Sequence, residues 1–412
     1  MFSRRTSGVR LGLTRIRRVF AELSGEYKAW LSTVEVVQVV GTNGKGSTSA
    51  MLEAGLLSRG RRVGLFTSPH LHRVGERIRL GGCAVSDEVV RCKYEQVQRA
   101  ERHVEERCTF FEVLTLIALE CFAEARPEVV ILEAGLGGRL DSTRVLPPQY
   151  VLVTKIGLDH QFYLGDTIEA IAAEKAAVIE RGCQAMSVSG QSAAARDVLF
   201  ARSAEVGVSM QWTDSLDRSP PGLPGPHQRE NAGLALAALR HFYPEASAAA
   251  LDGVCWPGRI EVLRSMPPGV PAGSGVVCFD VAHNEDGIRA LCAALQAGDW
   301  DVVIFGCMVD KRPEDLVALL RAWLDPRAAL WLTPPRDEAG MDAHRLAESG
   351  DRVFEPRSSQ LVAAFSEALV AGRRVLVCGS HFLVSDLRSS VLNVRAEHPD
   401  SPELSDPVGR RR

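Results

Sequence analysis

Short apolar runs recur along the chain, separated by glycine turns and by stretches with helical spacing. The most complete run covers residues 34–40, where five of seven positions are valine. We expect further strands at residues 62–66, 129–132, 151–156, 276–279, 302–305, 329–332 and 374–378. Helical patterns cover residues 11–31, 50–58, 87–106, 113–122, 168–179, 316–323 and 360–370, and residues 184–207 hold a further strand and helix. Because strands and helices alternate, the pattern predicts an α/β fold with mostly parallel strands.

A proline- and glycine-rich stretch divides this alternation into two series. Residues 265–275 contain three prolines and three glycines, and the strand–helix pattern starts again after them. A chain of 412 residues is also too long for one ordinary core. We therefore predict an N-terminal domain at 1–264, a linker at 265–275, a C-terminal domain at 276–395 and a disordered tail at 396–412.

Composition narrows the functional class. Hydrophobic residues make up 46% of the chain and charged residues 24%, as in soluble globular proteins. The net charge of −3 argues against a nucleic-acid partner, and no apolar stretch is long enough to cross a membrane. The ten scattered cysteines include no C-x-x-C pair and fit reduced thiols. These features predict a cytoplasmic enzyme.

A glycine loop follows the first predicted strand. Its residues are Gly41, Thr42, Asn43, Gly44, Lys45, Gly46, Ser47 and Thr48. A strand, a glycine loop and a helix together aim backbone N–H groups and a helix N-terminus at a phosphate. Lys45 would reach the outer phosphates, and Ser47 or Thr48 would offer a hydroxyl to Mg²⁺. The spacing departs from G-x-x-x-x-G-K-[ST], and a plain glycine turn is the alternative, but the preceding strand favours nucleotide binding.

Three further side chains stand out by their position in the pattern. Glu133 ends a buried strand, where P-loop enzymes place a metal-binding acid, although a structural acid is the alternative. His160 follows Asp159 at the end of another strand and is either a metal ligand or a structural histidine. Lys175 lies on an apolar helix stripe, so its ammonium must snorkel, pair with an acid or lose its charge.

A series of motifs runs through the chain in a fixed order. They are G-T-N-G-K-G-S at 41–47, T-S-P-H at 67–70, G-E-R-I at 75–78, F-F-E at 110–112, E-A-G-L-G-G-R at 133–139, D-H at 159–160, E-K-A at 174–176, H-Q-R-E-N-A at 227–232, P-G-R at 257–259, D-V-A-H-N at 280–284 and G-C-M-V-D-K at 306–311. This series resembles the folylpolyglutamate synthase and dihydrofolate synthase family, a branch of the Mur-type ATP-dependent amide ligases. The resemblance covers roughly residues 11–385.

The resemblance implies a P-loop N-terminal domain with a mostly parallel sheet and a smaller Rossmann-like C-terminal domain, with ATP between them. It also implies ATP-dependent addition of L-glutamate to a folate or dihydropteroate carboxylate through an acyl phosphate. Two Mg²⁺ ions are expected with ATP. The first would be held by Ser47, Ser68 and Glu133, and the second by His160 and a carbamylated Lys175.

Further roles follow from the resemblance residue by residue. Catalysis is assigned to Lys45, His160 and Lys175. Beyond the glycine loop, ATP contacts are assigned to Asn231, Arg259, Asp280 and His283, and substrate contacts to Pro69, His70, Glu76, Arg77, Arg139 and Asp141. We expect a monomer with small-molecule substrates and with no nucleic-acid or membrane partner.

Several alternatives are open from the sequence. Dihydropteroate and tetrahydrofolate compete as the glutamate acceptor, and many bacterial members of the family use both. A murein-type ligase is disfavoured because those ligases usually carry threonine where this chain has Gly46. A nucleotide-binding relative without catalysis is suggested by departures from the family at Arg144, Ala177 and Val281. We expect the Arg144 cation to lie near the substrate cleft and to raise the affinity for folate.

Overall fold

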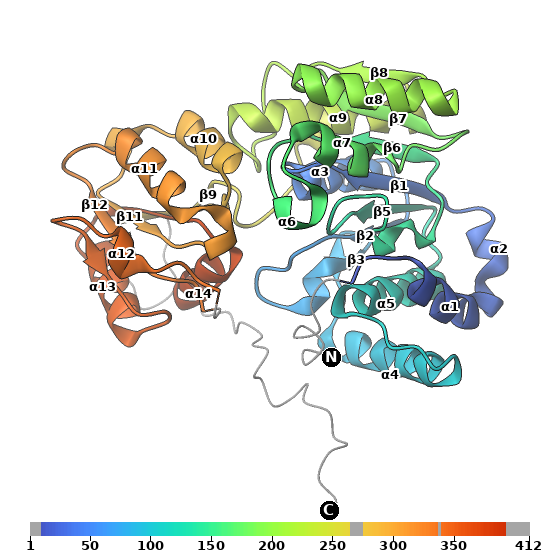
Figure 1. Cartoon of the computed structure of the whole chain (residues 1–412), viewed down its shortest axis with the longest axis horizontal. Coiled ribbons are helices and arrows are strands. Elements are labelled where there is room, and N and C mark those ends of the chain that lie inside the picture. Colours follow the sequence, from blue (N-terminus) through green and yellow to red (C-terminus); the bar gives the residue numbers. More distant parts are fainter. Residues whose placement is uncertain (1–9, 264–274, 337–338, 393–412) are drawn as a thin grey trace, which may run out of the picture. The chain divides into compact units, whose positions relative to one another are not determined.

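The computed structural model describes residues 10–263, 275–336 and 339–392, which form two compact units (Figure 1). The first unit contains residues 10–216 and 230–253. The second contains residues 217–229 and the described part of 254–396. Each unit has its own sheet with helices packed on it, so the prediction of two α/β domains is confirmed.

The first unit is built on an eight-stranded sheet in the order β4-β3-β2-β5-β1-β6-β7-β8. Its strands are β1 (Glu35–Val40), β2 (Val63–Phe66), β3 (Ile78–Leu80), β4 (Cys83–Ala84), β5 (Val129–Glu133), β6 (Tyr150–Val153), β7 (Gln184–Val188) and β8 (Met210–Thr213). The run from β2 to β8 in this order is parallel, whereas β3 and β4 are antiparallel at one edge. Because β1 pairs with both β5 and β6, the carboxyl ends of these three strands lie side by side.

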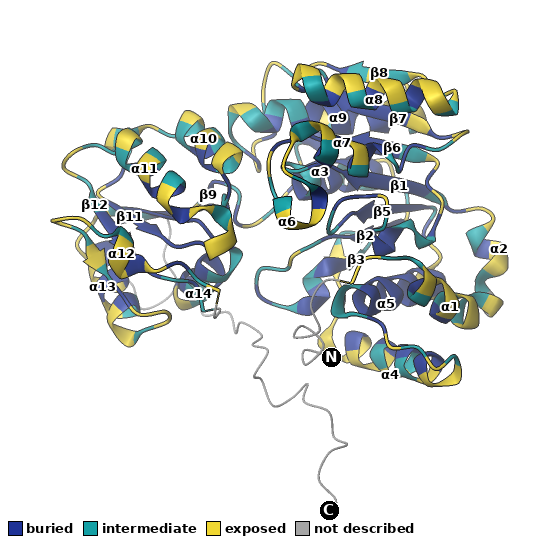
Figure 2. Cartoon of the chain, in the orientation of Figure 1, coloured by how far each residue is buried: buried dark blue, intermediate teal, exposed yellow. Residues whose placement is uncertain are grey.

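Helices bury both faces of the central strand β1. The helices that accompany the first sheet are α1 (Thr14–Leu23), α2 (Lys28–Leu31), α3 (Lys45–Leu57), α4 (Asp87–His103), α5 (Phe110–Ala125), α6 (Gln161–Leu164), α7 (Ile168–Ala176), α8 (Ala193–Val206) and α9 (Pro226–Phe242), with 3-10 turns at Ser24–Tyr27, Val74–Arg77, Ser142–Val145 and Ala248–Leu251. One core joins α1, α4 and α5 to Val36, and another joins α7 and α8 to Val40. Val37 and Val39 point to the opposite face and are also buried. Figure 2 shows the same contrast between buried strands and exposed outer helix surfaces.

The second unit has a six-stranded sheet in the order β13-β12-β11-β14-β10-β9. Its strands are β9 (Glu261–Leu263), β10 (Val276–Phe279), β11 (Val302–Phe305), β12 (Ala329–Leu332), β13 (Arg352–Val353) and β14 (Arg374–Cys378). Its helices are α10 (Glu285–Ala294), α11 (Pro313–Trp323), α12 (Ala343–Leu346), α13 (Ser359–Val370) and α14 (His381–Leu392), with 3-10 turns at Ala297–Asp299 and Val309–Lys311. All neighbouring strands are parallel except β9, which runs antiparallel to β10. This is the Rossmann-like arrangement that was predicted.

The boundary between the units lies earlier than the prediction at residue 264. Residues 254–263 belong to the second unit because β9 extends its sheet. Residues 217–229 belong to the same unit, although they precede a return of the chain to the first unit. The predicted linker at 265–275 lies outside the described residues apart from its last residue, and the predicted tail at 396–412 lies wholly outside them.

Two helices differ from their predicted limits. The helix expected at residues 11–31 is interrupted by the 3-10 turn Ser24–Tyr27, where serine and glycine weaken the helix. In contrast, α3 begins at Lys45, five residues earlier than expected. Gly44 adopts a left-handed φ of 89° and turns the loop directly into the helix. The glycine loop therefore leads without a spacer into the first turn of α3.

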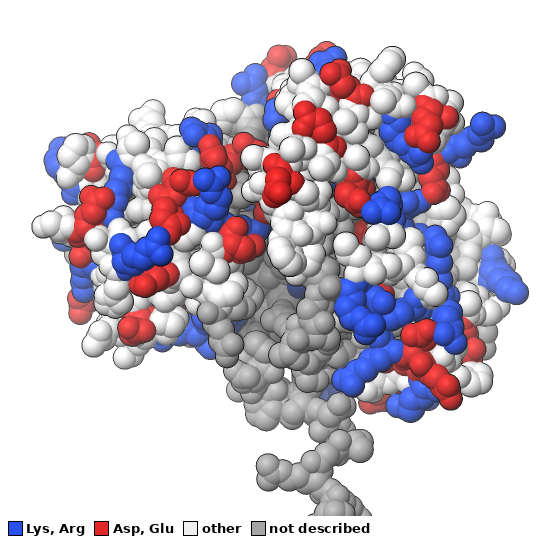
Figure 3. All heavy atoms as spheres, in the orientation of Figure 1, with Lys and Arg blue, Asp and Glu red and all other residues white. Residues whose placement is uncertain are grey.

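The described surface carries charges of both signs. Lysine and arginine side chains are interspersed with aspartate and glutamate on the face shown in Figure 3, as the net charge of −3 implies. Within the described ranges, no helix is long and apolar enough to cross a membrane.

Candidate functional site

The glycine loop lies between β1 and α3 at the carboxyl end of the first sheet. Gly41 has a φ of 147° and Gly44 one of 89°, which are conformations that favour glycine. Space also excludes larger residues. A Cβ at Gly41 would lie 1.9 Å from the Thr154 hydroxyl oxygen, and a Cβ at Gly44 would lie 2.3 Å from the Asn231 amide oxygen. The loop therefore requires glycine at both positions, which a plain turn would not.

The adjacent strand end holds this loop in place. The backbone N–H groups of Thr42 and Asn43 donate to the carbonyl of Lys155 at 2.8 and 3.2 Å. The Thr42 hydroxyl donates to the Gly157 carbonyl at 3.0 Å and accepts from the Gly157 N–H at the same distance. Because these residues follow β6, the partner of β1, the loop is fixed before any ligand arrives.

Lys45 occupies the first turn of α3 and folds back over the loop. Its ammonium donates to the carbonyls of Gly41 and Thr42 at 3.2 and 3.0 Å. Phosphate oxygens can replace these neutral acceptors because hydrogen bonds between charged groups are stronger. Ser47 and Thr48 are buried in the same turn, and the Thr48 hydroxyl oxygen has no hydrogen-bond partner in the part of the chain described. The loop thus combines a cation, backbone donors and hydroxyls.

The carboxyl ends of β2 and β5 bring Ser68 and Glu133 together. These strands are parallel neighbours, and the Ser68 N–H donates to Glu133 Oε2 at 3.0 Å. Glu133 is only 4% exposed, which places its carboxylate inside the sheet edge rather than in solvent. Since β1 lies on the other side of β5, the glycine loop and this carboxylate belong to adjacent strand ends. Carboxylate and hydroxyl oxygens are the ligands that a hard cation such as Mg²⁺ prefers.

Lys175 of α7 also reaches the glycine loop. Its side chain is 4% exposed, as its place on the apolar stripe predicted, and its Nζ donates to the Gly41 carbonyl at 2.8 Å. Burial is the main cause that lowers the pKa of Lys175 to about 7. The nearby Lys45 ammonium lowers this pKa as well, while the carboxylates of Asp159 and Asp141 raise it. A large fraction of the Lys175 amine is therefore neutral near pH 7.

His160 begins the short helix α6 and is exposed. Its φ of 51° is uncommon for a residue other than glycine, and its backbone N–H donates to the Asp159 carboxylate at 2.8 Å. Over the described residues, no group of three or more histidine, cysteine, aspartate and glutamate side chains is arranged to hold a metal ion. A metal at this sheet edge would therefore need ligands other than a cluster of such side chains in addition to Glu133.

The predicted substrate residues after β2 form a compact loop. Pro69 follows a cis peptide bond, and Arg77 donates from Nε to His70 Nδ1 at 2.8 Å. The Arg77 guanidinium also lies over the aromatic ring that begins α5, 5.7 Å from its centroid. Glu76 accepts hydrogen bonds from the backbone N–H groups of residues 71–73. Its carboxylate therefore shapes this loop from within.

Asp141 and Arg139 also have partners within the protein. The buried Asp141 carboxylate accepts from the two N–H groups of residues 135–136 at 2.9 Å each and from Thr143 N at 3.0 Å. It thereby holds the glycine run that follows Glu133. Arg139 donates to Glu174 at 2.8 Å, next to Lys175 on α7. These two predicted substrate residues thus tie the glycine run and α7 together in the structure.

A separate group lies around the end of β10 in the second unit. The Asp280 carboxylate accepts from Ile260 N at 2.9 Å and from Ala282 N at 2.8 Å, which fixes the backbone next to Arg259. His283 lies one residue beyond this turn and donates from Nδ1 to the carbonyl two residues earlier at 2.8 Å. Three predicted nucleotide residues are therefore gathered at one strand end of this unit.

Arg144, the cation expected near the substrate cleft, has partners within the protein. Its guanidinium pairs with Glu180 and donates to the Ala177 carbonyl at 3.2 Å. The Arg144 side chain is 10% exposed. Two departures from the family pattern, Arg144 and Ala177, therefore contact each other at the C-terminal end of α7. The charge of Arg144 is used to hold the helix that carries Lys175.

Sequence reasoning missed the residues that hold the glycine loop and the start of α5 in place. Thr154 and Lys155 contact the glycine loop, and their only signal was a position at the end of a strand. Glu112 of the F-F-E motif forms a capping box with Thr109 at the start of α5, and it also pairs with Arg15 at 3.1 Å. The S/T-x-x-E spacing at 109–112 could have identified that cap.

Comparisons with known proteins cover nearly the whole chain. The domain described as "Mur ligase, glutamate ligase domain" matches residues 258–381. The dihydrofolate synthase/folylpolyglutamate synthase of Escherichia coli (strain K12) is 33% identical over 401 residues, covering 91% of this chain and 90% of the relative. A structure of E. coli FolC in complex with DHPP and ADP aligns with a TM-score of 0.79 at 29% identity, covering 93% of this chain and 94% of that chain. A bifunctional folylpolyglutamate synthase/dihydrofolate synthase with Mn, AMPPNP and L-glutamate bound aligns with a TM-score of 0.78 at 29% identity, covering 94% and 95%.

Proposed function

Because this chain belongs to the dihydrofolate synthase/folylpolyglutamate synthase family, we propose that it uses ATP to join L-glutamate to a carboxylate of dihydropteroate, of a tetrahydrofolate, or of both. One observation carries the proposal. The glycine loop, Glu133 and Lys175 converge at the carboxyl ends of adjacent strands, where α/β proteins bind ligands. The DHPP, L-glutamate and nucleotides in the related structures support the same substrate classes for this chain.

ATP would be bound through its phosphates by the glycine loop. The N-terminus of α3 offers backbone donors to an anion, and Lys45 would exchange its carbonyl partners for phosphate oxygens. Asn231, which lies against Gly44, is proposed to face the adenine. Arg259, Asp280 and His283 of the second unit are proposed to contact the phosphate and the ribose.

The described residues also fit a divalent metal. Ser47, Ser68 and Glu133 provide two hydroxyls and a carboxylate, which are oxygen ligands suited to Mg²⁺. A second Mg²⁺ is proposed to use His160 and a carbamylated Lys175, since the lowered pKa of Lys175 provides the neutral amine that reacts with CO₂. Bound metal would neutralise the phosphate charge and orient the transferring group. The Mn in a related structure supports a divalent site.

The reaction that fits this site has two steps. The acceptor carboxylate attacks the γ-phosphate of ATP and yields an acyl phosphate and ADP. The amine of L-glutamate then attacks the acyl carbon and releases phosphate, which forms the amide. The protein contributes position and charge: Lys45 and the N-terminus of α3 hold the phosphate, while the Asp141 carboxylate keeps the glycine run after Glu133 in place.

The test is a ligase assay with the full chain, ATP, Mg²⁺ and L-glutamate, with dihydropteroate or tetrahydrofolate in separate reactions. We expect ADP release that depends on the acceptor and a product whose mass is increased by one glutamate residue. ATP hydrolysis without either product would contradict the proposal. Addition of an amino acid to a murein precursor would instead favour the murein-type alternative.

The proposal also includes a monomer that acts in the cytoplasm. Light scattering of the purified chain with and without nucleotide tests the first point, and cell fractionation tests the second. A stable dimer that loses activity on dissociation would contradict the monomer.

A further inference from the structure

A pocket of about 450 Å³ lies at the end of the first sheet opposite to the glycine loop. Its lining residues are Tyr27, Ala29, Trp30, Thr33, Glu35, Arg61, Arg62, Arg126, Pro127 and Glu128. They come from the segments that enter β1, β2 and β5, whereas the candidate active site follows the other ends of these strands. The pocket is therefore distinct from the candidate nucleotide site.

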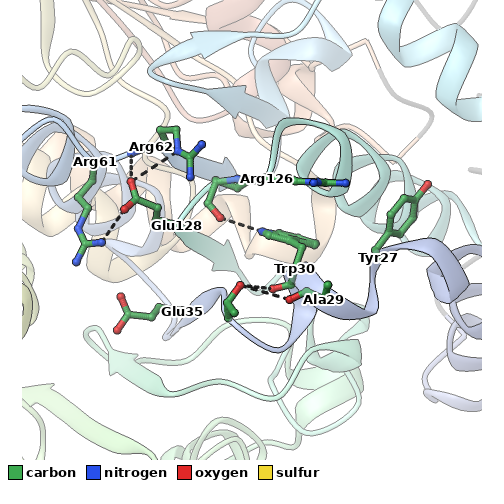
Figure 4. A pocket seen from close by; sticks show the side chains of 10 residues that line it. Tyr27, Ala29, Trp30, Glu35, Arg61, Arg62, Arg126 and Glu128 are labelled. Atoms are coloured by element: carbon green, nitrogen blue, oxygen red, sulfur yellow. Dashed lines mark hydrogen bonds and ion pairs between the residues drawn. The ribbon is translucent and has the colours of Figure 1, made fainter.

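Two of the three arginines in this pocket are tied to one carboxylate. Glu128 accepts from the Arg61 guanidinium at 2.9 Å and from the Arg62 backbone N–H at 3.1 Å, and Figure 4 shows both arginines turned towards it. These hydrogen bonds, led by that from the Arg62 N–H, lower the pKa of Glu128. Arg61 is further fixed because its Nε donates to the Tyr243 hydroxyl at 3.2 Å. This part of the pocket is a preformed wall in which Glu128 compensates part of the positive charge.

Arg126 differs from the other two arginines. In the described part of the chain, its guanidinium has no hydrogen-bond or ion-pair partner, and it is exposed on the side of Trp30 and Tyr27 (Figure 4). Its backbone has a φ of 50° at the end of α5, a left-handed conformation in which an arginine is strained and glycine is usual. A strained cation without a partner, at the mouth of a cavity, is a candidate for ligand contact.

The charges and the apolar wall define what would fit. The lining holds three arginines and two glutamates, which leaves one positive charge in excess. Trp30 already donates from Nε1 to the Pro127 carbonyl at 2.9 Å, so the indole offers its apolar surface and no free donor. The guanidinium fork of Arg126 suits the two oxygens of a carboxylate or a phosphate. The volume is within the range of small-ligand sites.

We propose that this pocket binds a small organic anion with a planar apolar body. Its oxyanion contacts Arg126, and its body lies against Trp30 and Pro127. The ligand class is shared by aromatic carboxylates and aromatic phosphate esters, and the site is separate from the one that binds substrates of the proposed ligase reaction.

The experiment measures binding of benzoate to the full chain by ligand-detected NMR. Acetate supplies the charge without the ring, benzyl alcohol supplies the ring without the charge, and phenyl phosphate replaces the carboxylate. We expect benzoate or phenyl phosphate to bind at least about tenfold more tightly than acetate and benzyl alcohol. The tighter of the two acids identifies the oxyanion that the site prefers.

Three variants keep this test falsifiable. Arg126→Gly removes the guanidinium and relieves the strained backbone, so it should weaken benzoate binding at least about tenfold while raising the melting temperature by a few degrees. Arg17→Ala removes an exposed arginine on α1, outside the pocket, and should leave binding unchanged. Lys45→Ala should also leave it unchanged, because the glycine loop lies at the other end of β1. Equal binding of benzoate to the wild type and to Arg126→Gly, or displacement of benzoate by ADP, would overturn the proposal.

Discussion

Lys45 is the side chain nearest to the proposed phosphate chemistry. Replacing it with alanine removes the cation that would face the transferring phosphate, while the loop keeps its backbone hydrogen bonds to Lys155. We expect Lys45→Ala to lower kcat on the order of a hundredfold or more with the fold intact. Steady-state kinetics measure the loss in kcat, and circular dichroism checks that the fold is intact. Near-normal turnover in this variant would contradict the assignment of the glycine loop to phosphate binding.

The burial of Lys175 predicts a pH-dependent cost in stability. Its folded pKa of about 7 lies below the unfolded value of 10.5, so between these values the unfolded chain binds one more proton. Stability therefore rises as the pH increases from about 7 to about 10.5, and the cost is complete below about pH 7. We expect Lys175→Met to exceed the wild type in unfolding free energy by a few kcal/mol at pH 6–7, with the gap closing at higher pH. Urea unfolding in CO₂-free, metal-free buffer measures it, and a gap that is independent of pH would contradict the shift.

The same lysine is expected to carry a carbamate when metal and nucleotide are bound. The neutral fraction of the amine at pH 7 can add CO₂, and the resulting anion replaces a buried cation with two oxygen ligands. With ¹³C-labelled CO₂, we expect one slowly exchanging carbamate resonance that is absent from Lys175→Met. If the fully active Mg²⁺–ATP complex shows no such signal, the second metal site needs another ligand.

For single residues, the sequence predicted whether a side chain is buried better than it predicted its hydrogen-bond and ion-pair partners. The apolar stripe on residues 168–179 correctly predicted a buried lysine, because helical periodicity alone fixes which side faces the core. The sequence could not show that the Asp141 carboxylate accepts hydrogen bonds from the N–H groups of residues 135–136, since that contact depends on how the loop after β5 folds back. The partner of Arg144 was not predictable for the same reason. Its partner Glu180 lies on a different segment that only the tertiary fold brings near.

At the scale of elements, the contact between Arg144 and the end of α7 links two parts of the site. The guanidinium joins the turn after Asp141 to the helix that carries Lys175. We expect Arg144→Asn to lower the unfolding free energy by about 1 kcal/mol, because a helix-end hydrogen bond and an ion pair with a half-exposed glutamate are lost. The Michaelis constant for the folate acceptor should be unchanged.

A double-mutant cycle separates the ion pair from other effects of this change. Glu180→Gln keeps the shape of the partner and removes its charge, and Glu180 is 47% exposed, so this variant alone should cost less. The two changes should be non-additive. An Arg144→Asn protein of normal stability with weakened folate binding would restore the role first expected for Arg144.

The ends of helices and strands were predictable where the hydrophobic periodicity determines them. They were not predictable where the φ angle of a single residue does. Most strands expected from apolar runs lie within a residue or two of those runs. However, β6 ends three residues before the run at 151–156 does, and the short strands β3, β4, β8 and β13 were not expected. The start of α3 was missed because the left-handed Gly44 brings the helix forward to Lys45. The short strand β9 was missed because three residues give little pattern, yet its pairing with β10 sets the boundary between the units.

For the whole molecule, nucleotide binding should be visible as stability. A ligand that binds only the folded state at about 100 times its Kd adds about 2.7 kcal/mol to the unfolding free energy. We expect ADP with Mg²⁺ to produce a shift of this size in the wild type and in Arg17→Ala, and a much smaller one in Lys45→Ala. Chemical denaturation at fixed nucleotide concentration measures it. Equal shifts in the unfolding free energy of all three proteins would show that the glycine loop does not bind the nucleotide through Lys45.

The central place of β1 has a consequence for how the protein is made. Val40, the last residue of β1 before the glycine loop, pairs with Val153, and Val39 pairs with Glu133. The ribosome must therefore add 113 residues (153 − 40) after Val40 before both neighbours of this strand exist. At about 5–20 residues per second this takes on the order of ten seconds, during which the valine-rich strand lacks at least one of its two partners. A nascent chain of this length is a natural client for chaperones that shield apolar segments during translation.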